Sequence, residues 1–326
     1  MRSPFTNGEA KICYELRKAT FRKENFEYKH RYYRCVDTEE TFTTTQLDAA
    51  NMSQVQNQYR AKYGIPFADE IKATRIKYGF SASKMSRILG FGENTYRLYE
   101  NGEMPSIANG KTLKAIQSPS VFKSYMDESE EITSDDKKMI ADKIEKVEDS
   151  SMESCIKSLI FQKLGRDKTN GYALQSTSRL KNVMLFFVER MGEIFITKMN
   201  KLLFFSDFIS YRDYGQAITG LSYKAIQYGP VPVSWNIVYG MIPDIELKIV
   251  SFDNGNEGQK LTSGISYDES SLTEEQVEVL ERVYKKFRNY SSKEISEISH
   301  KEKAWAENKE DHDLIDFDYA FDIVAL

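Results

Sequence analysis

The sequence KMNKLLFFSDFISYRDYGQAITGLSYKAIQYGPVPVSWNIVYG, residues 198–240, sets the architecture of the C-terminal half of the chain. Its first part continues a wide apolar face over residues 195–215, which predicts a long buried helix. The second part predicts a short strand, a turn at Gly229-Pro-Val-Pro232, where proline fixes φ and ends the preceding element, and then a further helix. Because helical patterns also flank this stretch, we expect one α-rich domain over residues 153–326.

A second helical pattern lies upstream, in SKMSRILGFGENTYRLYENGEMPS, residues 83–106. Gly90 suits a left-handed turn between two short helices. The apolar residues expected to face inward from these two helices are Met85, Ile88, Leu89, Tyr96 and Tyr99. The arrangement is typical of a helix-turn-helix unit, which we place over residues 66–126. In such a unit the start of the second helix reads base edges.

The outward-facing polar residues of this unit predict a DNA-binding surface. An asparagine can pair with adenine, and an arginine with guanine, through two hydrogen bonds. The residues expected to face the bases are Glu93, Asn94, Thr95 and Arg97. The residues expected to contact phosphates, which position a protein without specifying sequence, are Lys84, Arg87 and Lys111.

Charge is unevenly distributed along the chain. The formal net charge is -4, yet residues 71–126 hold nine Lys or Arg and three Glu, whereas residues 127–150 hold ten acidic residues and four Lys. This predicts a cationic unit followed by an acidic linker over residues 127–152. The linker runs into a helical pattern formed by Ile140, Ile144 and Val147.

The cysteine spacing and the length of the apolar runs indicate the cellular location of the protein. Cys13, Cys35 and Cys155 are widely separated, which argues against a disulfide framework and fits a reducing cytoplasm. No run of eighteen apolar residues occurs, so no membrane span is expected. The start MRSPFTNGEAKICYEL lacks the apolar core of a secretion signal. We therefore expect a cytoplasmic protein.

Residues 1–65 combine a strand pattern with a helix pattern. FEYKHRYYRC and ETFTTT, separated by the polar turn VDTE, predict a small hairpin. TTTQLDAANMSQVQNQYRAKYG predicts a helix that ends near Gly64. The residues expected on its buried side are Leu47, Met52, Val55 and Tyr59. The predicted fold class is mainly α with a small β element at the N-terminus.

The ending YENG-x-x-PS resembles the Cro/repressor-type helix-turn-helix family, in which a Glu and a Gly precede a Pro-containing turn. This resemblance implies that Glu100 is structural and bonds back to the earlier helices. Together with RYYRCVDTEETFTTT, residues 31–45, the region resembles the zinc-ribbon and helix-turn-helix antitoxins of the MqsA-like group. The base-contacting asparagine of that group matches Asn94. Leu98 stands where the group has an arginine, with Arg97 one place earlier.

The zinc ribbon of the MqsA-like group has only a degenerate counterpart in residues 1–65. The group carries two Cys-x-x-Cys pairs, of which Cys13 and Cys35 alone remain. Two thiols cannot complete a tetrahedral zinc site. We therefore expect neither a metal nor another cofactor.

The C-terminal half carries a further resemblance. The pattern runs through Lys201-Leu-Leu, Phe-x-x-Asp207, Tyr214-Gly, Ile218-Thr-Gly220, Tyr223, Tyr228-Gly-Pro-Val-Pro232 and ISHKEKAW at 298–305. It resembles the Panacea domain, the antitoxin domain of SocA-like proteins, which implies neutralisation of a toxin by direct contact. Because Tyr and Trp most often anchor protein interfaces, we expect an aromatic toxin-binding surface. Its predicted members are Tyr223, Tyr228, Pro230, Pro232 and Trp235.

An enzyme is not expected. Asp207, Asp213, His300 and Glu302 have no catalytic or metal-binding spacing, and GFGENT lacks the Gly-Lys-Ser/Thr ending of a phosphate loop. Asp207 on an apolar helix is read as a buried, hydrogen-bonded structural acid. His300 is expected to pack near Trp305.

The sequence thus predicts an antitoxin of a type II toxin–antitoxin system. The C-terminal domain would bind a cognate toxin encoded by an adjacent gene, and the helix-turn-helix would bind operator DNA, as a homodimer, to autoregulate transcription. Two alternatives stay open. One is an adaptor that hands a toxic partner to a protease, and the other is a prophage transcriptional regulator without a toxin.

Overall fold

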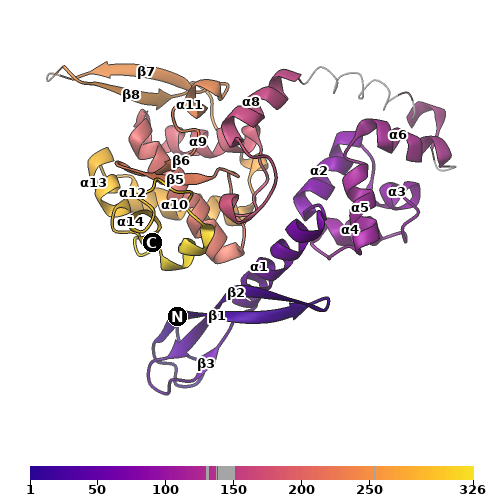
Figure 1. Ribbon diagram of the computed structural model, residues 1–326, viewed down its shortest axis with the longest axis horizontal. Coiled ribbons are helices and arrows are strands. Elements are labelled where there is room, and N and C mark those ends of the chain that lie inside the picture. The colour runs from indigo at the N-terminus through magenta and orange to yellow at the C-terminus, as the bar shows by residue number, and fades with distance from the viewer. Residues whose placement is uncertain (130–131, 137, 139–150, 253–254) are drawn as a thin grey trace. The chain divides into compact units, whose positions relative to one another are not determined.

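The computed structural model describes residues 1–129, 132–136, 138, 151–252 and 255–326 (Figure 1). The chain forms two compact units. The split unit comprises Met1–Val55 and Ile156–Leu326, and the middle unit comprises Gln56–Cys155. The helix predicted around Ile140, Ile144 and Val147 lies outside the described residues.

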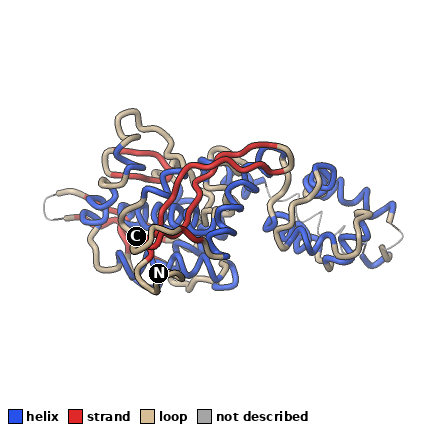
Figure 2. The backbone as a smooth tube through the Cα atoms, turned by 90° about the horizontal axis from the view of Figure 1, so that it is seen from below, coloured by secondary structure: helices blue, strands red, loops and turns tan. Residues whose placement is uncertain are grey.

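The N-terminal part of the split unit is a three-stranded antiparallel sheet in the order β1-β2-β3. Strands β1 (Ala10–Phe21) and β2 (Glu24–Cys35) pair along their whole length, and β3 (Thr41–Phe42) pairs with the end of β2. Arg22 and Lys23 connect β1 to β2, with φ of 50° and 70°. Two consecutive left-handed residues match the twist of a tight hairpin. Figure 2 shows these paired strands in red.

This sheet overturns the predicted fold class. The chain is 49% helical and 17% strand, and residues 10–42 form a sheet rather than a minor β element beside a helix-turn-helix. Strand β1 was missed because most of its side chains are exposed on both faces, so AKICYELRKATF lacks a clear alternation of apolar and polar residues. The chain is therefore a mixed α and β protein.

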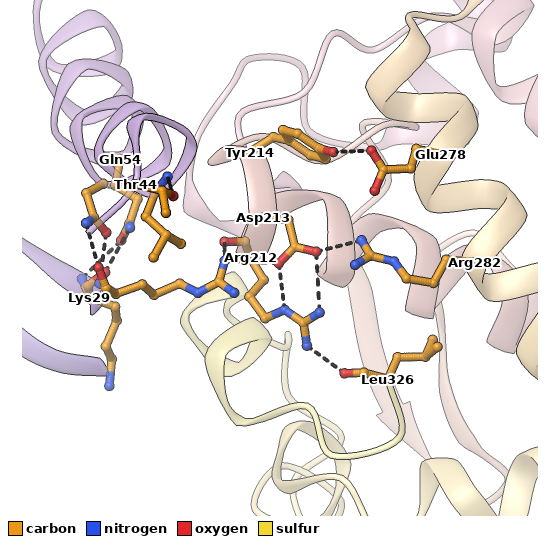
Figure 3. A network of polar contacts seen from close by, with 12 residues as sticks. Lys29, Thr44, Gln54, Arg212, Asp213, Tyr214, Glu278, Arg282 and Leu326 are labelled. Carbon is orange, nitrogen blue, oxygen red and sulfur yellow. Dashed lines mark hydrogen bonds and ion pairs between the residues drawn. The ribbon is translucent and has the colours of Figure 1, made fainter. Parts of the chain in front are cut away.

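Helix α1 (Thr45–Tyr63) seals the outer edge of β2. The side-chain amide of Asn51 accepts a hydrogen bond from the Arg31 N–H and donates one to the Arg31 carbonyl, both at 2.9 Å. Gln54 bonds the N–H and the carbonyl of Lys29 in the same way, at 3.0 Å each (Figure 3). Two amide side chains thus satisfy main-chain groups that another strand would otherwise bind.

The middle unit is helical. Its helices are α2 (Ala68–Tyr78), α3 (Ala82–Ile88), α4 (Thr95–Glu100), α5 (Ile107–Ala115) and α6 (Pro119–Glu128). Gly90 has a φ of +67°, as the predicted turn requires. The residues predicted to face inward are confirmed, because all of them are buried in one core: Met85, Ile88, Leu89, Tyr96 and Tyr99. The predicted bond from Glu100 to an earlier helix is also confirmed, since Arg75 of α2 binds its carboxylate at 2.6 Å.

The C-terminal part of the split unit is built around helix α10 (Ile196–Tyr214), which is buried at every position from Met199 to Tyr211. The other helices of this part are α9 (Thr177–Met191), α11 (Val238–Met241), α12 (Glu274–Phe287), α13 (Ser292–Ser299) and α14 (Lys303–Ala306). Helix α8 (Ser151–Phe161) precedes them. Helix α10 contacts α12, α13 and strand β6.

The short strand predicted in this α-rich region is confirmed as β5 (Tyr223–Ile226), but the structure adds further strands and arranges them in two small sheets. Strands β4 (Ile194–Phe195), β8 (Glu257–Thr262) and β7 (Glu246–Ser251) form one sheet, and β5 pairs with β6 (Gly229–Pro232) in the other. The Gly-Pro-Val-Pro segment, predicted as a turn, is therefore a strand. Proline is tolerated there because β6 has only one strand partner. Within the described helices, none has both the length and the apolar character that crossing a bilayer requires.

Candidate functional site

Asp207 lies at the centre of the C-terminal part and is fully buried. Its carboxylate accepts hydrogen bonds from the Ile218 and Thr219 N–H groups, each at 2.8 Å, and from the Tyr223 hydroxyl at 2.6 Å. Burial raises the pKa of Asp207, while these hydrogen bonds act in the opposite direction. The carboxylate ties α10 to the segment leading into β5, which confirms the predicted structural acid.

Lys201, two turns earlier on α10, fixes strand β6. Its ammonium is fully buried and donates a hydrogen bond to the Pro230 carbonyl at 2.9 Å. Burial lowers the pKa of Lys201 to about 7. A Cβ at Gly229 would lie 2.7 Å from the Lys201 Cε and 2.6 Å from the Ser299 Oγ, so only glycine lets this strand approach the lysine.

The hairpin of β5 and β6 presents Tyr228 at its turn. Tyr228 is 65% exposed, whereas strand β6 beside it is buried. The Trp305 indole N–H donates to the Ile226 carbonyl at 2.7 Å, and the His300 ring stacks on Trp305 with 4.0 Å between centroids. This confirms the predicted packing of His300 near Trp305. Burial, followed by the charge of Lys201, lowers the pKa of His300.

Three cavities adjoin at Thr197, near the start of α10, with volumes of about 880, 410 and 420 Å³. We call their combined lining the Thr197 surface. It is built from the β4–β8–β7 sheet, the N-terminal turn of α10, the C-terminal ends of α9 and α12, the segment from Trp235 into α11, helix α13 and the turn after β5. Five large apolar side chains are both exposed and part of this lining: Tyr228, Trp235, Leu247, Ile249 and Phe252.

Charged groups at the rim of the Thr197 surface are mostly engaged within the split unit. Glu193 binds Lys248 at 2.9 Å and Lys260 at 3.3 Å. Lys198 donates to the Arg288 and Tyr290 carbonyls at 3.1 and 2.6 Å, and burial lowers its pKa. The accessible part of this surface therefore combines apolar and aromatic side chains with a few exposed charged ones: Glu257, Arg288, Lys293 and Glu297.

Only part of the predicted toxin-binding set is accessible. Tyr228 and Trp235 are exposed and lie on the Thr197 surface. Tyr223, Pro230 and Pro232 are buried and support the hairpin from behind. The sequence interpretation missed Leu247, Ile249 and Phe252, although Leu247 and Ile249, two positions apart, indicate a strand with an apolar face.

The predicted DNA-binding residues lie on the surface of the middle unit. Asn94 is the residue preceding α4. The exposed members of the set are Arg87, Glu93, Asn94, Arg97 and Lys111, while Thr95 is half-buried. Lys84 is half-buried too, and its ammonium binds the Asp136 carboxylate at 2.6 Å. This hydrogen bond, with others from Thr133, lowers the pKa of Asp136 to about 2.

The cysteines that carried the zinc-ribbon resemblance lie on the N-terminal sheet. Cys13 faces Tyr32 across the strand pair, whereas Cys35 faces Ala10 and is buried. In the part of the chain that the structure describes, no three His, Cys, Asp or Glu side chains are grouped so that they could hold a metal ion.

An accessible aromatic surface on a rigid, buried scaffold is typical of a binding domain. Residues 199–306, which contain Asp207, Lys201, the β5–β6 hairpin and α13, match the model of the family described as antitoxin SocA-like, Panacea domain. The match supports a Panacea domain in this part of the chain and a role related to toxin–antitoxin systems. Comparisons with curated proteins and with solved structures gave no match.

Proposed function

We propose that the protein is an antitoxin that binds a cognate protein toxin through the Thr197 surface. The observation that carries this proposal is the cluster of exposed apolar side chains around adjoining cavities in the domain that matches the family. Contiguous exposed apolar patches mark interaction sites, because leaving them in water is unfavourable. Trp235 and Tyr228 have the side-chain types that most often dominate binding energy.

The buried bonds beneath the hairpin support this assignment. Lys201 and Trp305 hold the main chain at both sides of the Tyr228 turn, at Pro230 and Ile226. A side chain on a turn fixed in this way loses little conformational freedom when a partner binds. Tyr228 is thus positioned as an anchor before the toxin arrives.

A growth assay tests the proposal. The protein is co-expressed with each small neighbouring reading frame, and the frame whose toxicity it relieves is taken as the toxin. Trp235→Ala and Tyr228→Ala should each abolish or strongly reduce relief of toxicity, because truncating an interface anchor costs roughly 2 kcal/mol or more. Leu314→Ala, at an exposed apolar residue outside the Thr197 surface, is the matched control and should retain it. Full relief by folded Trp235→Ala and Tyr228→Ala variants would place the toxin elsewhere.

We also propose that helices α3 and α4 bind operator DNA, so that the antitoxin regulates its own transcription. The exposure of Asn94 and Arg97 and the cationic balance of residues 71–126 support this step. Tyr96 and Tyr99 are anchored in the core and set the orientation of α4, which turns Arg97 to solvent.

The proposed binding of operator DNA can be tested separately. Asn94→Ala with Arg97→Ala should weaken binding to the promoter duplex by about 1–3 kcal/mol per lost bidentate contact, and should leave relief of toxicity intact. Lys123→Ala, at an exposed lysine of α6, is the control for a simple loss of positive charge. A double variant that binds the promoter like the parent protein would remove α4 from the interface. Loss of toxin relief in that folded variant would refute the separation of the two roles.

A further inference from the structure

The two long edges of the N-terminal sheet differ in how their main-chain groups are covered. The outer edge of β2 is closed by Asn51 and Gln54 of α1 and then by β3. Strand β1 is the other edge of the sheet. A long unpaired edge strand is a template for pairing with another chain, so proteins usually cover it or disrupt it.

The pairing register identifies which groups of β1 are open. Opposite residues in an antiparallel pair alternate between exchanging both main-chain hydrogen bonds and exchanging none. Lys29 and Arg31 direct their N–H and C=O groups to Gln54 and Asn51, so their partners Leu16 and Tyr14 direct theirs to the opposite side, away from the hairpin. Among the described residues, none binds the outward main-chain groups of Leu16.

The open part of the edge has a defined centre. The Ala10 N–H, which belongs to the same outward set, already donates to the Met1 carbonyl. Pairing with another strand can therefore run from Lys11 to the turn after Phe21. The midpoint of this stretch is Leu16, which is 62% exposed.

Side-chain charge then distinguishes the possible partners. If β1 pairs antiparallel with β1 of a second copy so that Leu16 lies opposite Leu16, Glu15 of each copy lies opposite Arg17 of the other. The register can shift only in steps of two residues, because the outward main-chain groups of the two strands must stay opposite each other. One such step places Glu15 opposite Glu15, and the same step in the other direction places Arg17 opposite Arg17. Like charges directly opposite are unfavourable, and opposite charges are favourable.

We infer that two copies of this chain associate through β1, in antiparallel register with Leu16 on the two-fold axis. The register uses the whole open edge and places the two Glu15–Arg17 pairs symmetrically about the axis, as a two-fold interface requires. Within one copy Arg17 already bonds Glu15 at 2.6 Å, with both side chains about half exposed. Association would join these two pairs into a four-charge cluster. The inference is independent of toxin and DNA binding.

Charge exchange between two variants tests this surface in the full-length protein. In Arg17→Glu both copies carry Glu at 15 and 17, and in Glu15→Arg both carry Arg, so each variant faces two repulsive pairs across the axis. Each should raise the dimer dissociation constant about tenfold or more. When the two variants are mixed, every pair across the axis becomes Glu opposite Arg, and a heterodimer should form with an affinity near that of the parent protein. Sedimentation velocity measures the association of each variant alone and of their mixture, and circular dichroism checks that each variant is folded.

The mixing step separates this interface from an effect within one chain, because each variant retains its own like-charged neighbours at 15 and 17 after mixing. Lys123→Glu, in the middle unit, reverses an exposed lysine away from β1 in the sequence and should leave the dimer unchanged. A parent protein that sediments as a monomer at micromolar concentration overturns the inference. So does a dimer that Arg17→Glu and Glu15→Arg leave unaffected, or two variants that stay monomeric when mixed.

Discussion

Arg31 on β2 donates a hydrogen bond to Asp213 near the end of α10, at 3.0 Å, although 182 residues separate the two in the sequence. Asp213 also accepts from Arg212 at 2.9 Å and from Arg282 at 2.6 Å (Figure 3). Burial acts to raise the pKa of Asp213, but the Arg212 hydrogen bond and the charges of the three arginines outweigh it and lower the pKa. One carboxylate thus joins the first and last segments of the split unit.

Replacing Asp213 by asparagine should destabilise the split unit strongly. Asp213→Asn leaves three guanidinium groups around a neutral amide, and breaking a buried ion pair from one side costs about 3–5 kcal/mol. Urea unfolding followed by circular dichroism measures the loss. Glu278→Gln weakens the exposed contact to Tyr214 and should change the free energy of unfolding by less than about 0.5 kcal/mol. A similarly small change for Asp213→Asn would show that the ion pairs of Asp213 do not hold the β1–β2 hairpin in the split unit.

The Asp213 carboxylate also makes the stability of the folded protein sensitive to acid. The folded-state pKa of Asp213 is lowered below 3.8, so its stabilising contribution is complete above that pH and is lost as the pH falls through the folded-state pKa. The Asp213→Asn variant should therefore lose less of its remaining stability than the parent protein when the pH is lowered below 4. Equal acid losses in the two proteins would contradict the lowered pKa.

Lys201 should also make the stability rise with pH, but in a higher pH range. Its folded-state pKa is about 7 and its ordinary value is 10.5, so between these values the unfolded chain binds a proton that the folded chain does not. The free energy of unfolding should therefore rise with pH, by about 2 kcal/mol between pH 7 and 9. Lys201→Met should remove this rise. Lys293→Met, at an exposed lysine of α13, should preserve it. A rise that persists in Lys201→Met would assign it to another group.

Gly229 should tolerate no side chain. In Gly229→Ala the new Cβ would meet Lys201 and Ser299, and the φ of +101° is unfavourable for alanine. Overpacking and backbone strain together predict a loss of about 2–5 kcal/mol in thermal or urea unfolding. Gly165→Ala is the matched control, because Gly165 also has a positive φ but open space around it. Equal losses at both glycines would show that strain alone acts at Gly229.

Freeing Lys84 should strengthen DNA binding, if the middle unit binds DNA as proposed. Asp136→Asn removes the carboxylate that engages the Lys84 ammonium, so one more cation becomes available to a phosphate. The slope of log binding constant against log salt should steepen by about one unit in fluorescence anisotropy titrations. Asp135→Asn changes an exposed neighbour by the same charge and controls for net charge. A slope shared by both variants and the parent protein would place Lys84 outside the DNA contact.

Sequence patterns were informative where one physical constraint acted alone. Gly90 and Tyr96 were predicted correctly because a left-handed turn and a buried helical face each leave a local signature. Asp207 was recognisable because an acid within an apolar helix must be hydrogen-bonded. These residues establish the helical framework of both units.

The remaining features depend on partners that are distant in the sequence. Strand β1 has few buried side chains, so its main evidence is the pairing with β2 rather than its own pattern. Met52 was assigned to the buried side of α1, but it is exposed, whereas Asn51 is buried against β2. The accessible members of the Thr197 surface could not be separated from Tyr223 by residue type alone, because all are apolar or aromatic.

The Arg31–Asp213 bond also has a consequence for synthesis of the protein. At about 5–20 residues per second, a ribosome needs roughly 10–40 s to extend the chain from Arg31 to Asp213. During this interval the nascent β1–β2 hairpin has no Asp213 carboxylate to bind, whereas the segment that contains the compact middle unit has been synthesised in full before Asp213. Translation therefore favours an order in which the inserted middle segment matures first and the two flanking segments join last.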